Sequence, residues 1–169
     1  MFIKSRTYYL STLLISLLFT SCLKRESYPV EPHIEYVNFV KYINNAGIED
    51  KGTLIFSFTD GDGDIGLKTS DTLPPFNESG DYYYNLYIFY KELQHGVLTP
   101  IELPLPFHTR LPVITPSGNN KAIKGEMEVK LDIFNPLSTF DTISFDFYLV
   151  DRALHVSNTV STPLIVVHK

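Results

Sequence analysis

Disulfide bonds cannot hold this chain together, because its 169 residues include a single cysteine, Cys22. A chain without disulfides depends on its apolar core, and a chain of this length can bury a sizeable one. Tryptophan is absent as well, so the paired cysteines and the core tryptophan that mark antibody domains are both missing. The chain also lacks a convincing amphipathic helix beyond its first residues, which argues against a helical fold.

Signatures of enzyme chemistry are missing too. The five histidines are scattered and form no HExxH pair, and the chain has no GxSxG nucleophile turn and no phosphate-binding glycine loop. We therefore predict that the protein is not an enzyme. Hydrolysis by a pair of carboxylates is the remaining catalytic alternative.

The most distinctive stretch is an acidic loop that follows a strand-like alternation of Leu54, Phe56 and Phe58 with polar residues. Its sequence is Asp60-Gly61-Asp62-Gly63-Asp64-Ile65-Gly66. At ~6 Å and an effective dielectric constant of about 20, two carboxylates repel each other by roughly 3 kcal/mol. A calcium ion would turn this repulsion into attraction, because it binds about six to eight oxygen ligands. The alternative is a turn whose aspartates accept backbone N–H groups and face water.

The spacing of the loop matches positions 1, 3 and 5 of an EF-hand calcium loop, with Asp71 at position 12. Gly66 lies one residue after the usual glycine, and the flanks show no helical pattern, so we predict a calcium loop on a β scaffold. Asp151 follows a later predicted strand and would join the loop if both strands ended at the same pole. The alternative is an ion pair within the turn at the end of that strand. The predicted metal ligands are Asp60, Asp62, Asp64, Gly66, Asp71 and Asp151.

The first residues have the pattern of an export signal. Basic Lys4 and Arg6 precede an apolar run, residues 8–19, that is shorter than the about 20 residues needed to span a bilayer. The run ends in Leu18-Phe19-Thr20-Ser21-Cys22, which resembles a bacterial lipoprotein signal with a relaxed lipobox. The resemblance implies that residues 1–21 are removed and that lipidated Cys22 anchors the protein to the membrane. Residues 22–32 are polar and proline-bearing, as a short tether would be.

The negative net charge of the chain limits the kinds of partner that it can bind. Removing residues 1–21 would take away two basic residues and no acid, which makes the net charge of −5 more negative by two. A domain of this charge is a poor ligand for nucleic acid or anionic lipid. We predict instead a location in the cell envelope, at the outer membrane, and an envelope protein or a glycan as partner. Tyr83 and Tyr87 would form a stacking platform for such a partner or, alternatively, pack within the fold.

Hydrophobic residues alternate with a period of two from His33 onward, which predicts strands. We expect residues 33–169 to form one all-β domain, an antiparallel two-sheet sandwich of the immunoglobulin-like kind, with a small β-barrel or jelly roll as the alternative. Pro163 places part of the last strand at an edge or bulge. The predicted strands are residues 34–43, 53–59, 82–91, 97–103, 123–134, 142–150 and 158–168.

Several motifs together carry a family resemblance. They are Phe56-x-Phe58 followed by the acidic loop, Pro74-Pro75-Phe76, Tyr84-Asn85-Leu86 and Asp151-Arg152-Ala153-Leu154-His155-Val156-Ser157-Asn158. With them the chain resembles a group of uncharacterised lipoproteins from Bacteroidota, over most of its length after Cys22. The resemblance implies an outer-envelope lipoprotein with a β-sandwich-like domain and no assigned activity. We expect a calcium-stabilised, non-catalytic binding or accessory module, or alternatively a structural subunit of an outer-membrane complex without metal.

Overall fold

The computed structural model describes residues 26–114 and 121–169, and this part of the chain contains strands and no helix. No segment of it is therefore a helix long and apolar enough to cross a membrane. The export signal, Cys22 and residues 115–120 lie outside the described residues. The strands are β1 (His33–Ile43), β2 (Glu49–Asp60), β3 (Leu86–Gln94), β4 (Val97–Pro100), β5 (Ile123–Asp132), β6 (Thr142–Leu149), β7 (Val160–Ser161) and β8 (Ile165–Val166).

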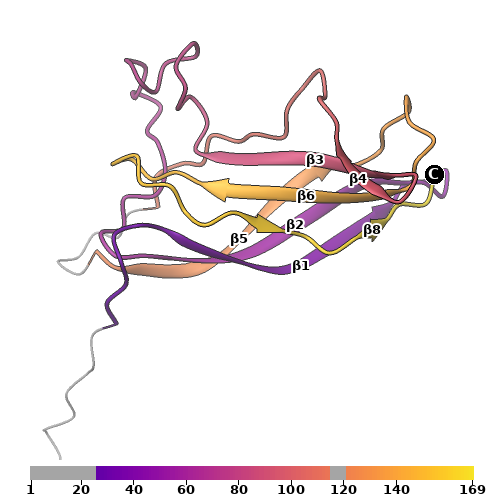
Figure 1. Ribbon diagram of the computed structural model, residues 1–169. Coiled ribbons are helices and arrows are strands. Elements are labelled where there is room, and N and C mark those ends of the chain that lie inside the picture. The colour runs from indigo at the N-terminus through magenta and orange to yellow at the C-terminus, as the bar shows by residue number, and fades with distance from the viewer. Residues whose placement is uncertain (1–25, 115–120) are drawn as a thin grey trace, which may run out of the picture.

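The strands form two sheets that face each other (Figure 1). One sheet has the order β1-β2-β5, and the other has the order β4-β3-β6-β7 with β8 also paired to β6. Every pair of neighbouring strands is antiparallel. The structure thus confirms the predicted all-β antiparallel sandwich, and its two separate sheets differ from the closed barrel that was the alternative.

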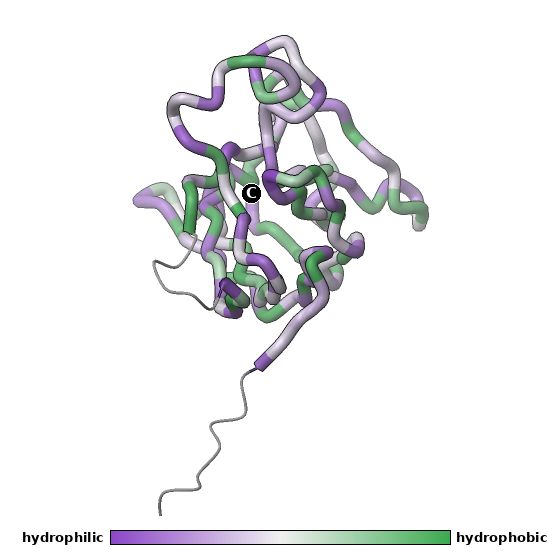
Figure 2. The backbone as a smooth tube through the Cα atoms, turned by 90° about the vertical axis from the view of Figure 1, so that its left-hand side faces the viewer, coloured by the Kyte–Doolittle hydropathy of each residue, from purple (hydrophilic) through white to green (hydrophobic). Residues whose placement is uncertain are grey.

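The core lies between the sheets and is formed mainly by the inward-facing residues of β2, β3, β5 and β6. Leu54, Phe56 and Phe58 of β2 are at most 7% exposed, and the rings of Phe56 and Phe147 meet across the sandwich at 5.3 Å between centroids. Buried and less buried residues alternate from Leu54 to Asp60 of β2, as expected for a strand with one buried face. Figure 2 shows the sandwich from one end, with the backbone coloured by hydropathy. Each fully buried large apolar side chain contributes roughly 1.5–3 kcal/mol to folding.

Four strand predictions need correction at their ends. The second strand begins at Glu49 rather than at residue 53. The third strand begins at Leu86 rather than at Tyr82, because the N–H groups of Tyr82 and Tyr83 bond to Pro75 and Gly80 in the preceding loop. β4 ends at Pro100, before the predicted end at residue 103. The last predicted strand is divided into β7 and β8 on either side of proline, the interruption that the sequence indicates there.

Part of the predicted tether lies against the domain instead of extending from it. Glu26 forms an ion pair with Lys124, the second residue of β5, at 2.6 Å. The start of β5 pairs with the end of β2, because Ile123 lies opposite Asp60. The chain therefore enters the sandwich at the end where the acidic loop lies, which we call the aspartate end (residues 60–66 and 151–157).

Candidate metal centre

Asp60 is buried because it continues the inward-facing series of β2. Residues 54, 56 and 58 face the core, and Asp60 is the next residue of that parity, with 0% exposure. β6 has the same design, because its inward residues 143, 145, 147 and 149 are followed by Asp151, which is 1% exposed. Each strand thus places a carboxylate where its next apolar side chain would lie.

Equal spacing brings these two carboxylates together. Asp60 follows Phe56 by four residues, and Asp151 follows Phe147 by four residues. The rings of Phe56 and Phe147 are in contact, and β2 and β6 both end at the aspartate end of the sandwich (Figure 1). The two strands therefore deliver their terminal aspartates to the same point between the sheets.

Asp62 and Asp64 complete a group of four carboxylates with Asp60 and Asp151. Each residue offers an oxygen atom, and these four oxygens all lie within 4.8 Å of one another. Asp62 and Asp64 are partly exposed, so the group opens to solvent on their side. Such a set of oxygen atoms can hold a metal ion.

Backbone N–H groups and one histidine orient the carboxylates. Asp60 Oδ2 accepts the N–H of Asp64 at 3.0 Å, and Asp64 Oδ2 accepts the N–H of Ala153 at 3.0 Å. Both oxygens of Asp151 contact His155, which donates its backbone N–H to Oδ1 and has its ring Nδ1 2.8 Å from Oδ2. The bond from Ala153 links the acidic loop to the loop after β6.

The remaining oxygens of the acidic loop have no partner. Asp60 Oδ1, Asp62 Oδ1 and Asp64 Oδ1 are shielded from solvent and receive no hydrogen bond. Leaving a buried polar atom unpaired costs roughly 1–3 kcal/mol, and more when the group is charged. Three such atoms beside one another fit a cation, which would be bound by all three.

The electrostatics of the group agree with this geometry. Burial is the largest of the causes that together raise the pKa of Asp60 to about 6, and the interaction with Asp62 and repulsion from Asp64 and Asp151 are the others. The pKa of Asp64 is raised by burial and by Asp151. The hydrogen bond to Asp151 raises the pKa of His155. Without a cation, the group therefore holds protons at pH values where ordinary aspartates are ionised.

Gly66 and Asp71, the two other predicted ligands, lie outside the group of four. The carbonyl oxygen of Gly66 accepts a hydrogen bond from Arg152 Nη2 at 2.9 Å. Asp71 Oδ2 accepts the N–H of Lys68 at 2.8 Å and lies 3.7 Å from Arg152 Nε. Both residues thus contact Arg152. Contrary to the prediction from the EF-hand spacing, the loop does not bring Asp71 to the other carboxylates.

Sequence reasoning did not assign His155 or the N–H of Ala153 to this site. His155 follows Asp151 by four residues, a spacing at which a side chain can return to bond the same carboxylate. That spacing was the available signal for His155. The N–H of Ala153 carries no sequence signal, because every residue except proline has one.

The tyrosines of the predicted platform lie on the outer face of β3 and beside it. Tyr87 stacks on Tyr148 of β6 at 4.8 Å between centroids, and the ring of His108 lies 5.1 Å from Tyr87. Tyr83 lies under the guanidinium of Arg110 at 5.3 Å. Much of each ring face is therefore already covered by a neighbouring side chain, which leaves less area for a sugar to stack on.

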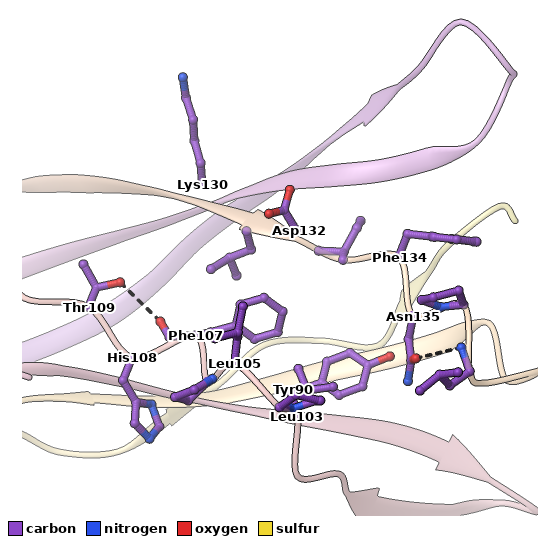
Figure 3. A pocket seen from close by; sticks show the side chains of 16 residues that line it. Tyr90, Leu103, Leu105, Phe107, His108, Thr109, Lys130, Asp132, Phe134 and Asn135 are labelled. Atoms are coloured by element: carbon purple, nitrogen blue, oxygen red, sulfur yellow. Dashed lines mark hydrogen bonds between the residues drawn. The ribbon is translucent and has the colours of Figure 1, made fainter.

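A groove of about 540 Å³ lies on one side of the sandwich (Figure 3). Its walls are the second half of β5 with the residues that follow it and the segment from Leu103 to Thr109. The lining is mainly apolar, and Leu105 and Leu137 at its border are 82% and 91% exposed. The groove is separate from the four carboxylates and shares no lining residue with them.

Comparison with known proteins does not extend this picture. No protein-family model, no curated protein and no solved structure matches the sequence or the fold. The function of the chain is therefore argued from its fold and from the four carboxylates at the aspartate end.

Proposed function

We propose that the protein is a non-catalytic, calcium-stabilised β-sandwich module of the cell envelope, which serves as a binding or accessory unit. The observation that carries this proposal is the set of three unpartnered carboxylate oxygens on Asp60, Asp62 and Asp64, beside the buried Asp151. A divalent cation at their centre satisfies all three oxygens at once. It also removes the repulsion between four neighbouring negative charges.

The donor set favours calcium over other divalent ions. All four side chains offer oxygen, whereas zinc sites draw on cysteine and histidine. The ring of His155 is turned to Asp151 and orients that carboxylate. Magnesium demands near-octahedral geometry and retains its waters, while calcium accepts six to eight oxygens in flexible geometry. Four carboxylates, one or more of them bidentate, together with water on the side of Asp62 would fill such a sphere.

The bound ion would join the two sheets at one end of the sandwich. The acidic loop follows β2 of one sheet, and Asp151 follows β6 of the other. Without the ion, the described hydrogen bonds between these two loops are those that the N–H of Ala153 donates to Asp64 and the guanidinium of Arg152 donates to Gly66. A cation adds a strong link at the same place, and its role is therefore structural.

We also infer that the sandwich is immunoglobulin-like. The first, second and fifth strands share one sheet, and the third, fourth, sixth and seventh share the other. Immunoglobulin-like sandwiches divide their strands in this way, with strands A, B and E opposite strands C, F and G. The resemblance of the closing segment, residues 151–158, to such bacterial modules supports the same assignment.

The proposed anchor is Cys22, with the domain held at the outer membrane and facing an envelope protein or a glycan. The lipobox-like sequence and the resemblance to Bacteroidota lipoproteins support this part of the proposal. The position of Glu26 against β5 means that the tether would reach the domain at the aspartate end. The bound ion would then stiffen the end of the sandwich nearest the membrane.

Calcium titration of the full chain tests the metal site. With calcium at 100 times its Kd we expect about 2.7 kcal/mol of added stability over protein in chelator, measured by denaturant unfolding. Asp62→Asn, at a partly exposed position, should lower calcium affinity more than tenfold without unfolding the chain. Asp81→Asn is the matched control outside the group. Equal stability in calcium and in chelator would refute the proposal, and so would an unchanged affinity in Asp62→Asn.

A further inference from the structure

One long strand edge of the sandwich is open. β5 pairs with β2 on one side, and no strand among the described residues pairs with its other side. The edge of β1 is partly covered, because the side chain of Asn158 bonds both the N–H and the carbonyl of Ile34. β4, at the edge of the second sheet, has only four residues. β5 has ten residues in one unbroken register with β2, whereas the eleven residues of β1 are interrupted by two register shifts, so β5 is the more regular free edge of the described chain.

The hydrogen-bond register shows which backbone groups face this edge. The N–H of Ile133 bonds to the carbonyl of Asp50, the residue that the β2–β5 register places opposite it. Because antiparallel bonding alternates, odd-numbered residues of β5 bond to β2 and even-numbered residues direct their N–H and C=O groups outward. The even-numbered residues are Lys124, Glu126, Glu128, Lys130 and Asp132.

These five residues are all charged and exposed, and their order has a symmetry. Read forward the signs are plus, minus, minus, plus and minus. Read backward they are minus, plus, minus, minus and plus, so four of the five positions meet the opposite charge when the strand is paired with itself about Glu128. Pairing about Met127 instead would place lysine against lysine and glutamate against glutamate.

We propose that β5 pairs with β5 of a second copy of this chain, antiparallel, about a two-fold axis at Glu128. Lys124 then lies opposite Asp132 of the second copy, and Glu126 lies opposite Lys130, each pair occurring twice. Lys124 retains its ion pair with Glu26, since an ammonium group has three donors. The single like-charged pair at Glu128 is outweighed by four opposite pairs of similar individual strength.

The apolar face of β5 fits the same register. Ile123 would lie opposite Ile133 of the second copy, and Met127 would lie opposite Val129. Ile123 and Met127 are only partly buried in one copy, so pairing removes further apolar area from water. The groove that Leu131 and Ile133 help to line borders this half of β5. The pairing joins two three-stranded sheets into one six-stranded sheet.

Disulfide trapping of the full chain tests both the contact and its register. In the proposed pair the two Glu128 Cα atoms are about 5.5 Å apart, within the range of a disulfide. Glu128→Cys should therefore give a crosslinked dimer under mild oxidation. Glu126→Cys is the matched control, because its two copies would lie about 13 Å apart. Cys22 is present in both variants, so any crosslink through it appears equally in both.

A charge exchange gives a second readout. Lys130→Glu replaces two opposite pairs by two like pairs and should weaken the dimer about tenfold in sedimentation velocity. The double variant Glu126→Lys/Lys130→Glu restores both pairs in reverse and should recover the dimer. Lys68→Glu, an exposed change of equal charge away from β5, should have no effect.

The proposal fails if wild-type chain sediments as a monomer at all concentrations, or if Glu128→Cys gives no dimer. It also fails if Glu126→Cys crosslinks as well as Glu128→Cys, because contact would then not depend on register. If the edge instead binds a strand of another protein, the wild-type chain will not self-associate and will sediment as a monomer. None of the results depends on calcium, so they leave the metal site to its own test.

Discussion

The two ends of the sandwich differ in whether their buried carboxylate oxygens receive hydrogen bonds. At the end opposite the aspartate end, which we call the glutamate end and define by Glu49 and Glu92, each carboxylate is supplied with donors. Glu92 is 1% exposed and accepts hydrogen bonds from four side chains. The donors are Tyr90 Oη at 2.9 Å, Gln94 Nε2 at 3.0 Å, Asn135 Nδ2 at 3.1 Å and Ser138 Oγ at 2.8 Å. At the aspartate end, three equally hidden oxygens have none.

The pKa values follow this difference. Burial alone would raise the pKa of Glu92, yet the hydrogen bonds from its neighbours lower it. Burial also opposes ionisation of Glu49, but hydrogen bonds from Lys41 and His168 lower its pKa to about 2. The pKa of Asp60 is instead raised to about 6. A buried carboxylate thus stays charged where the protein itself provides donors, and at the aspartate end the proposed cation would take that part.

The largest expected effect comes from removing the carboxylate at the glutamate end. Glu92→Leu would leave four donors facing an apolar side chain, and we expect a loss of about 4 kcal/mol in the free energy of unfolding. Glu92→Gln keeps an acceptor and should cost less than half of that. Denaturant unfolding measures both variants. The loss should be equal in calcium and in chelator, and a loss confined to calcium would show that the two ends are not independent.

A smaller effect should appear in the pH dependence of the metal-free protein. The folded pKa of Asp60 lies above the ordinary value of 3.8, so its contribution to stability is complete below that value and is lost as pH rises through about 6. The shift corresponds to roughly 3 kcal/mol. Glu49 behaves in the opposite sense, since its contribution is present above 4.5 and is lost as pH falls through about 2. Between pH 4.5 and 7 the aspartate end therefore makes stability fall as pH rises, while His108, whose pKa is lowered by burial, contributes in the opposite sense.

Unfolding of the chain and of Asp60→Asn in chelator across this pH range measures the trend, and the difference between the two isolates the contribution of Asp60. We expect wild type to lose stability relative to Asp60→Asn as pH rises through about 6. Saturating calcium should reverse this difference, because the ion binds the deprotonated carboxylates and competes with protons. A difference that does not change between pH 4.5 and 7 in chelator would contradict the assigned electrostatics of Asp60.

The smallest effect compares one glycine at each end. Gly66 has φ of 101°, and an added Cβ would lie 2.1 Å from the carbonyl oxygen of Pro112. Gly47, in the turn between β1 and β2, has φ of 81° with open space around it. We expect Gly66→Ala to cost about 2 kcal/mol, from strain and from displacement of the backbone, and Gly47→Ala about 1 kcal/mol, from strain alone. Thermal or denaturant unfolding of the two variants measures the difference in their loss of stability. Equal losses would mean that the backbone around Gly66 moves aside for the added Cβ at little cost.

The acidic loop and the alternating strands were accessible from sequence because both are local patterns. The alternation of Leu54, Phe56 and Phe58 predicts the buried face of β2, and Asp60 continues it. Glu92 could have been found in the same way, since it has the inward parity of Ile88 and Tyr90. The full set of four donors could not have been found from the sequence, because Asn135 and Ser138 come from the segment after β5, more than 40 residues away.

The all-β class, most strand positions and the three closely spaced aspartates of the loop follow from local sequence patterns. Only the packing of the two sheets brings Asp151 to Asp60, turns Asp71 and Gly66 to Arg152 instead, and selects which carboxylates receive donors. The difference arises because periodicity records which face of a strand is buried. The distance between residues 91 positions apart depends on how two sheets pack, and here contact between Phe56 and Phe147 fixes it.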